Sequence, residues 1–356
     1  MKLLADSTLP NLTDLFADHF TLTTYDSQEQ LPDLIAKHDI LLCRSTLKVS
    51  ARFLANSSLQ CVATASSGVD HIDTAYLTIQ GIHLFDAKGC NARSVADYVI
   101  ATLALLQKNQ QLTGNKAGVI GAGEVGRQVI ARLCAAGMDV VCFDPLKAIE
   151  DSSQTYCSLA ELASCDLLCI HANLHDTLPY PSENLFDATL LAQLKPGVVI
   201  VNAARGGIVN EAALLANPKP IIYCTDVYCN EPAIDPRIVD FAHLCTPHIA
   251  GHSVDAKIAA VIKICEQLHH HYKLPMPPLN LPLIDNKQII PPPLNWQDCV
   301  LDLYNPLVET FSLKTASDKK QAFITLRPMH QNRHDFINYD ARHVNSQIKS
   351  LLGYSA

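Results

Sequence analysis

The sequence lacks three features: an apolar run long enough to cross a membrane, a Cys-x-x-Cys pair and an excess of positive charge. A membrane helix needs about 20 consecutive apolar residues. The N-terminal apolar run breaks at Asp6, which is too early for a secretory signal. The formal net charge of −8 argues against nucleic acid as the main partner. We therefore expect neither a membrane partner nor a nucleic-acid partner.

The thirteen cysteines are an odd number, and most of them stand inside apolar runs such as "VVCFD" and "DLLCIHA". A free thiol in such a run behaves as a small hydrophobic side chain. The spacing contains no pair typical of a redox or metal motif. The sequence therefore predicts a reduced, cytoplasmic protein, and we assign no metal site.

The length of 356 residues favours two or more domains. Short apolar runs alternate with polar or helical stretches over the first ninety residues, and residues 92–109 read as one long buried helix. A second series of six strand candidates then follows, with helical patterns between several of them, which is typical of a doubly wound parallel sheet. The expected strands lie at 1–6, 39–45, 60–66, 82–87, 117–123, 139–145, 166–172, 197–204, 221–227 and 243–249.

The composition changes after a helical pattern over residues 255–272. Residues 274–293 hold seven prolines, so this stretch is expected to be a linker or an extended arm. The last sixty residues contain Trp296, the single tryptophan, and two or three further elements. Their apolar positions are too few to bury a core of their own, so we expect them to pack against a partner subunit.

The segment "GVIGAGEVGRQVI" carries a G-x-G-x-x-G pattern at Gly121, Gly123 and Gly126, between a predicted strand and a predicted helix. Gly121 permits the tight turn, Gly123 lets the backbone approach a pyrophosphate, and Gly126 allows close packing of helix and strand. Asp144 ends the next strand eighteen residues past Gly126. Its carboxylate can bind the ribose hydroxyls and would repel a 2′-phosphate. The pattern therefore predicts a dinucleotide site that takes NAD in preference to NADP; the alternative is a plain turn between strand and helix.

Three charged or titratable side chains follow later strand candidates: Arg205, Glu231 and His248. In open parallel sheets, chemistry gathers beyond the carboxyl ends of the strands. An arginine can bind a carboxylate and polarise a carbonyl oxygen. A histidine beside a carboxylate can take or give a hydroxyl proton, because the carboxylate orients the imidazole and stabilises its charged form. Each residue alone could be structural, but together they predict hydride transfer on a 2-hydroxy acid.

Four blocks together resemble the D-isomer-specific 2-hydroxyacid dehydrogenases: "GVIGAGEVGRQV", "LKPGVVIVNAARGGIVNEAALL", "DVYCNEP" and "TPHIAGHS". The resemblance spans residues 1–273 and assigns catalysis to Arg205, Glu231 and His248. It implies an NAD domain at 93–254, with a Rossmann-type fold, inserted into a flavodoxin-like substrate domain formed by 1–92 and 255–280. It also implies that residues 281–356 form a small C-terminal α+β domain that makes the protein a homodimer.

The resemblance also adds cofactor positions beside the glycines and Asp144. These positions are Glu124, Val125, Ala172, Ala203, Asp226 and Gly251.

Within that family, "LLCRSTLKVS", "ATASSGVDHID" and "KGCNARSVADYVI" resemble the branch that oxidises 4-phospho-D-erythronate in pyridoxal phosphate synthesis. Arg44, Ser45 and Lys48 form a short loop after a strand, where two cations and a hydroxyl make a phosphate site; the alternative is a solvated basic loop. The expected substrate contacts also include Ser66 and His252.

Three positions depart from the family pattern. His252 stands where a tyrosine is usual, and Ser66 and Ala172 stand where a threonine is common. These changes leave the three catalytic residues in place but leave two other readings open. One is a phosphoglycerate dehydrogenase or another D-2-hydroxyacid dehydrogenase. The other is a non-catalytic NAD-sensing scaffold, against which the complete Arg–Glu–His set counts.

Overall fold

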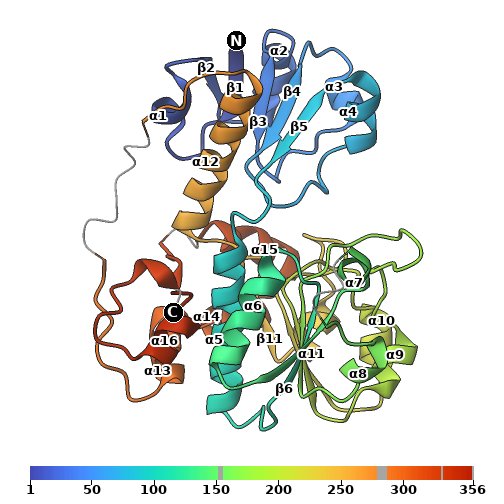
Figure 1. The fold of residues 1–356 in the computed structure, drawn as a ribbon. Helices are drawn as coiled ribbons and strands as arrows, with labels where there is room; N and C mark the ends of the chain where they lie inside the picture. The colour runs from blue at the N-terminus through green and yellow to red at the C-terminus, as the bar shows by residue number, and fades with distance from the viewer. Residues whose placement is uncertain (151–154, 279–286, 330–331, 355–356) are drawn as a thin grey trace. The chain divides into compact units, whose positions relative to one another are not determined.

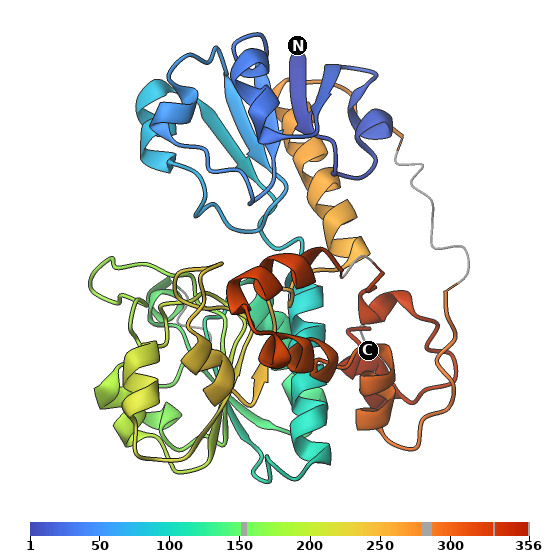
Figure 2. The same ribbon diagram turned by 180° about the vertical axis from the view of Figure 1, so that it is seen from behind.

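The chain folds into two compact units in a computed structural model, which describes residues 1–150, 155–278, 287–329 and 332–354. Unit 1 comprises residues 1–91 and 254–286, and unit 2 comprises residues 92–253 and 287–356. Figures 1 and 2 show the two units as separate sheets, each with its own helices. The predicted boundary at 280/281 lies outside the described residues. The roles assigned to the domains stay predictions.

Unit 1 is a five-stranded parallel sheet in the order β2-β1-β3-β4-β5. Its strands are β1 (Lys2–Asp6), β2 (Thr21–Tyr25), β3 (Ile40–Cys43), β4 (Cys61–Thr64) and β5 (His83–Asp86). Its helices are α1 (Leu12–Phe16), α2 (Leu31–Ile35), α3 (Ala51–Leu54), α4 (Thr74–Gln80) and α12 (Val254–His271). The sequence pattern missed β2, because this edge strand "TLTTY" buries only Tyr25 and has no apolar run.

One face of the unit 1 sheet is covered by α1 and α12. Ala260, Val261, Ile264 and Leu268 of α12 share a core with strand residues such as Leu3. The helix follows the first segment of unit 2, residues 92–253, in sequence. Unit 1 is therefore assembled from two segments that are far apart in the chain.

Unit 2 contains a six-stranded parallel sheet in the order β11-β10-β9-β8-β6-β7. The strands are β6 (Lys116–Ile120), β7 (Asp139–Phe143), β8 (Leu167–Ile170), β9 (Val198–Asn202), β10 (Ile221–Thr225) and β11 (Leu244–Cys245). The helices among them are α5 (Ala92–Lys108), α6 (Glu124–Ala135), α7 (Pro145–Glu150), α8 (Leu159–Leu162), α9 (Ala188–Gln193), α10 (Glu211–Ala216) and α11 (Pro236–Phe241). Strand order reverses at β6, which is where this fold binds its ligands.

The C-terminal segment adds four helices to unit 2: α13 (Trp296–Leu303), α14 (Leu307–Thr315), α15 (Lys319–Leu326) and α16 (Ser346–Leu351). Val300, Phe336 and Leu351 share a core cluster with α5 and α6, and Leu313 and Phe323 join the core on the opposite face of the sheet. The expectation that this segment must pack against a partner was therefore wrong for these side chains. They find their apolar partners on the same chain.

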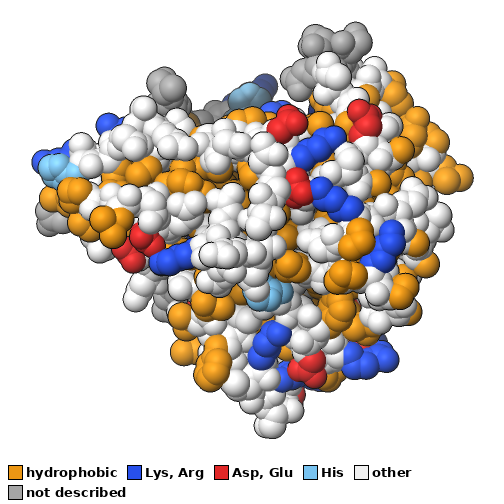
Figure 3. Space-filling model, turned by 90° about the horizontal axis from the view of Figure 1, so that it is seen from below, with side chains coloured by type: hydrophobic (Ala, Val, Ile, Leu, Met, Phe, Trp, Pro, Cys, Tyr) orange, Lys and Arg blue, Asp and Glu red, His pale blue; other side chains and the backbone are white. Residues whose placement is uncertain are grey.

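Polar and charged side chains are dispersed over the surface. Figure 3 shows acidic and basic side chains interspersed among apolar ones on one face of the molecule. None of the described helices is long and apolar enough to cross a membrane. All thirteen cysteines are free thiols, and most are buried.

Candidate active site

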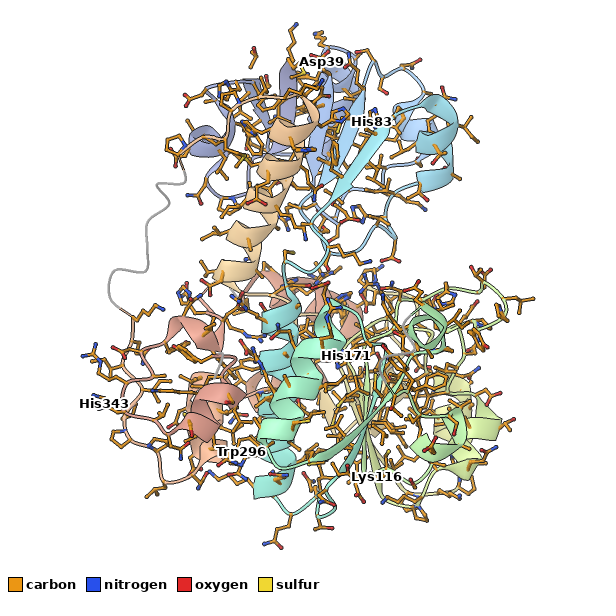
Figure 4. All side chains as sticks on the ribbon, in the orientation of Figure 1. Asp39, His83, Lys116, His171, Trp296 and His343 are labelled. Atoms are coloured by element: carbon orange, nitrogen blue, oxygen red, sulfur yellow. The ribbon has the colours of Figure 1, made fainter. Side chains whose placement is uncertain are left out.

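The predicted site residues of unit 2 gather at the carboxyl edge of its sheet. Figure 4 marks the two ends of the sheet: Lys116 begins β6, and His171 follows the last residue of β8. Because all the strands are parallel, the loops after β6, β8, β9, β10 and β11 leave from the same edge. The strand order places the loops that carry Arg205, Glu231 and His248 next to one another.

The three glycines of the motif each meet a different structural requirement of the loop. Gly121 has a φ of 94°, a backbone conformation that residues with a Cβ avoid. A Cβ at Gly126 would lie 1.8 Å from the carbonyl oxygen of Gly121, so helix α6 can approach the turn only with glycine there. A Cβ at Gly123 would meet nothing within 4 Å. The open space at Gly123 therefore lies where a ligand could reach the backbone.

A dinucleotide fits this loop. Gly123 is the N-cap of α6, a helix of twelve residues whose N-terminus favours an anion. Glu124 and Val125 are the first residues of that helix. Ala172 contacts the turn from the other side, because its backbone nitrogen lies 2.8 Å from the position of a Cβ on Gly121.

Asp144 directly follows β7 and is anchored by two backbone groups. Its Oδ2 accepts from the Ala122 N–H at 2.8 Å, and its Oδ1 accepts from the Lys147 N–H at 3.0 Å. These bonds fix the carboxylate against the glycine loop and leave lone pairs for further donors. The position suits the predicted contact with the ribose hydroxyls of NAD.

Asp226 is buried to 1 % exposure directly after β10. Its carboxylate accepts from the Thr246 hydroxyl at 2.7 Å, the Ile249 N–H at 2.7 Å and the Ala250 N–H at 2.8 Å. Burial raises the pKa of this carboxyl, while the charge of His248 and the three donors oppose the rise. Asp226 therefore supports the loop that carries His248; its predicted contact with the cofactor, like those of Ala203 and Gly251, stays a prediction.

His248 and Glu231 form a hydrogen-bonded pair at this edge. The imidazole Nδ1 lies 2.6 Å from the Glu231 Oε2, and the side chains are 31 % and 21 % exposed. The Glu231 Oε1 accepts from the Tyr228 N–H at 2.9 Å. Burial opposes ionisation of Glu231, but the hydrogen bond and charge of His248 and the Tyr228 N–H hold its pKa below the usual value. The pair leaves the imidazole Nε2 as the atom that can exchange a proton with a substrate.

The loop of Arg205 is held close to the loop of Glu231 by Gly206. A Cβ at Gly206 would lie 1.9 Å from the carbonyl oxygen of Tyr228, so the two loops can approach each other only with glycine there. The Asn202 side chain braces the loop, because its Nδ2 donates to the Arg205 carbonyl at 3.0 Å and its Oδ1 accepts from Ala204. The structure thus brings the three predicted catalytic residues onto adjacent loops.

The predicted phosphate loop lies in unit 1, directly after β3. Arg44 donates a hydrogen bond from Nη1 to the Thr8 hydroxyl, which itself donates to Asp6 at 2.5 Å. Ser45 and Lys48 are exposed. The neighbouring loop after β4 carries Ser66, whose carbonyl accepts from the Ala87 N–H at 3.1 Å.

Lys257 of α12 is a cation that the sequence interpretation did not include. Burial, and after it the positive charge of Arg44, lowers the pKa of Lys257. An anion bound near two such like charges would relieve their repulsion. No spacing in the sequence links the two residues, which come together only because α12 returns to unit 1.

His252, which belongs to unit 2, donates its backbone N–H to the Ile249 carbonyl at 2.8 Å.

Comparison with known proteins shows the family to which the chain belongs. Residues 100–250 match the family described as "D-isomer specific 2-hydroxyacid dehydrogenase, NAD binding domain". The chain is 50% identical over 339 residues to an erythronate-4-phosphate dehydrogenase of Legionella pneumophila, covering 95% of this chain and 96% of the relative. The chain belongs to the erythronate-4-phosphate dehydrogenase family.

Other members of the erythronate-4-phosphate dehydrogenase family are more distant. The proteins of that name from Hahella chejuensis and Coxiella burnetii are 35% and 36% identical, covering 78% and 77% of this chain and 74% and 75% of the relatives. Membership confirms the sequence prediction of an NAD-dependent dehydrogenase that acts on a CH–OH group.

Solved structures confirm the predicted α/β fold with two parallel sheets. A formate dehydrogenase from Staphylococcus aureus has a TM-score of 0.64 at 22% identity, over 76% of this chain and 96% of that chain. A 3-phosphoglycerate dehydrogenase from Entamoeba histolytica has a TM-score of 0.65 at 19% identity, over 77% and 95% of the two chains. The C-terminal segment was expected to be α+β, but its described residues form helices and no named strand.

Proposed function

We propose that this protein oxidises 4-phospho-D-erythronate at C2 to 2-oxo-3-hydroxy-4-phosphobutanoate with NAD, as a step of pyridoxal 5′-phosphate (vitamin B6) biosynthesis. The relatives that carry the name of this activity support the substrate. The observation that carries the chemistry is the 2.6 Å pair of His248 and Glu231, which lies at the same sheet edge as the dinucleotide loop. We expect the protein to work in the cytoplasm.

The proposed mechanism assigns each of the three residues one task. The Arg205 guanidinium binds the substrate carboxylate and polarises the oxygen on C2. The neutral His248 accepts the C2 hydroxyl proton at Nε2, and Glu231 stabilises the imidazolium that forms. The glycine loop at residues 121–126 and Asp144 would hold NAD, which would supply the acceptor for the hydride on C2. In the reverse direction the imidazolium of His248 returns the proton to the oxygen on C2.

We assign the phosphate of the substrate to the cations of unit 1. Arg44 is oriented by Thr8, and Lys257 lies close enough to sense its charge. A phosphate dianion would neutralise both cations and relieve their repulsion. Ser45 and Lys48 follow Arg44 in the same loop and supply a hydroxyl and a further cation.

We also infer a homodimer. Large apolar side chains on α14, α15 and the turn after α15 are exposed although the rest of the segment packs on its own chain. They are Leu307 (41 %), Val308 (65 %), Phe311 (70 %), Ile324 (45 %) and Met329 (73 %). Several exposed apolar side chains on one segment favour a subunit interface there.

The test of the activity is absorbance of the reduced nicotinamide, measured with purified protein, NAD and a panel of hydroxy acids. The panel holds 4-phosphoerythronate, erythronate and 3-phosphoglycerate. We expect 4-phosphoerythronate to give the highest kcat/KM. Faster turnover of 3-phosphoglycerate would favour a phosphoglycerate dehydrogenase, and NAD binding with no turnover of any acid would favour the scaffold.

The residue assignments have their own test in the same assay. Arg44→Ala and Lys257→Ala should raise KM for 4-phosphoerythronate far more than KM for erythronate. Lys263→Ala is the matched control, because Lys263 lies on the same helix but donates to the Lys88 carbonyl. His248→Ala should slow the chemical step roughly 10²–10⁴-fold and still bind NAD. Equal effects on both acids would remove the phosphate assignment.

A further inference from the structure

The C-terminal segment reaches the loop that carries His248. Residues 332–336 belong to unit 2, where Arg333 is 8 % exposed and Asp335 is 5 % exposed. The Asp335 Oδ1 accepts from the Ser94 hydroxyl at 2.5 Å, and the Ser94 hydroxyl also lies 2.9 Å from that of Ser253. A charged arginine is seldom buried unless other groups satisfy it. The contacts of the buried Arg333 therefore indicate its role.

Arg333 uses its guanidinium on two backbone carbonyls and one ring. Its Nη1 donates to the Ile249 carbonyl at 3.3 Å, and its Nη2 donates to the Ser94 carbonyl at 2.5 Å. Its Cζ lies 4.3 Å from the centre of the Tyr304 ring. Arg333 thus links α5, the C-terminal helices and the residue that directly follows His248.

The backbone next to His248 is held from two sides. Asp226 accepts the N–H groups of Ile249 and Ala250, while Arg333 donates to the carbonyl of Ile249. His248 itself has a φ of 56°, in the left-handed region that a residue with a Cβ rarely adopts. Such a conformation persists where the surroundings fix it. The two buried charges supply that constraint.

We infer that Arg333 is a positioning residue for His248, so that the C-terminal segment is part of the machinery for proton transfer. The inference rests on the proposed role of His248 as acid and base. A rotation of the 248–249 peptide would carry the imidazole away from Glu231, and their 2.6 Å hydrogen bond tolerates little displacement. Arg333 acts through this geometry and not by contact with the substrate.

The experiment compares Arg333→Lys with Arg342→Lys, a matched control on an exposed arginine of the same segment. Arg333→Lys keeps the charge but loses the planar fork that reaches two carbonyls. We expect kcat to fall roughly ten- to a hundredfold, with the affinity for NAD and the KM for the hydroxy acid within about twofold of the parent. The acid limb of kcat/KM for oxidation should move to lower pH. Arg342→Lys should move none of these values.

A double variant separates positioning from a general loosening of the protein. If Arg333 acts through the His248–Glu231 pair, Arg333→Lys should cause no further loss of kcat in a Glu231→Gln background, because coupled residues are not additive. Additive losses, or an unmoved acid limb in Arg333→Lys, would overturn the inference. If Arg333→Lys gives no protein that binds NAD, Ser94→Ala takes its place, because it removes one hydroxyl that contacts the same segment. Ser94→Ala should then also move the acid limb and cause no further loss of kcat in the Glu231→Gln background.

This outcome is distinguishable from failure of the proposed function. Full activity of His248→Ala would remove the proposed role of His248 itself. A large loss in His248→Ala together with additive effects of Arg333→Lys and Glu231→Gln would remove only the inference about Arg333.

Discussion

Replacement of Glu231 by glutamine should affect proton transfer in two ways, because the carboxylate performs two tasks. Its Oε2 faces the His248 Nδ1 at 2.6 Å, and its Oε1 accepts from the Tyr228 N–H at 2.9 Å. A glutamine has only one oxygen. If that oxygen stays with Tyr228, the amide NH₂ faces Nδ1 and forces the imidazole proton onto Nε2, which then cannot accept a proton from the substrate.

The loss of activity expected for Glu231→Gln has two causes, the lost charge of the carboxylate and the altered tautomer of His248. Two unit charges about 4 Å apart interact by about 4 kcal/mol at an effective dielectric constant of about 20. The exposed fractions of 31 % and 21 % let water screen part of this. A net loss of about 1.4 kcal/mol corresponds to tenfold in the population of imidazolium. A wrong tautomer can raise the loss of kcat for oxidation to roughly 10⁴-fold.

The assay is kcat/KM against pH in both directions. The pKa of Glu231 lies below its usual value, so the carboxylate is already ionised where a histidine titrates. The stability that this ionised group contributes is present above its ordinary pKa and is lost only as the pH falls through the lower folded value. If His248 exchanges the proton with the substrate, Glu231→Gln should move the acid limb of oxidation and the basic limb of reduction to lower pH, because the imidazolium loses the carboxylate that stabilises it.

Glu211→Gln is the matched control for this prediction. The Glu211 carboxylate accepts from the Cys229 N–H at 2.9 Å, in the same loop region but without a bond to His248. It should move the limbs far less than Glu231→Gln does. A Glu231→Gln enzyme with both limbs unmoved and with unchanged kcat would refute the assignment of this glutamate to the histidine.

Three further predictions concern the cofactor, stability and assembly. Asp144 should favour NAD over NADP by about 1–3 kcal/mol in kcat/KM, because it would repel the 2′-phosphate; comparable values for the two cofactors would contradict this. Asp97→Asn should lower the free energy of unfolding in urea by about 3–5 kcal/mol, since it leaves the buried Arg132 without its ion pair. Asp298→Asn, on a solvent-accessible pair with Lys108, should lower the free energy of unfolding far less. Phe311→Asp should shift the protein toward monomer in light scattering, and an unchanged mass would place the interface elsewhere.

The cofactor loop could be predicted from the sequence because its requirements are local. A glycine at a positive φ, a glycine under a helix and an acid at the end of the next strand all lie within one strand–helix–strand unit. The sequence also predicted that Arg205, Glu231 and His248 lie on neighbouring loops. Each stands in the loop after a strand, and parallel strands bring such loops to one edge of the sheet.

The sequence pattern was weakest where burial depends on distant segments. The edge strand β2 has little apolar alternation to reveal it. The C-terminal segment was expected to need a partner subunit, but Val300, Phe336 and Leu351 complete a core with α5 and α6. An apolar residue shows in the sequence that it will be buried; it does not show against which surface.

Contacts between segments that are far apart in the chain were decided by the tertiary structure alone. Lys257 senses the charge of Arg44 because α12 returns to the first sheet after residues 92–253 of unit 2. Arg333 reaches the Ile249 carbonyl from a segment 84 positions further along the chain. The side chains proposed for cofactor binding and proton transfer stand in short motifs that can be recognised in the sequence. The partners that hold those groups in place come from remote segments, and contacts between such segments leave no periodic signal in the sequence.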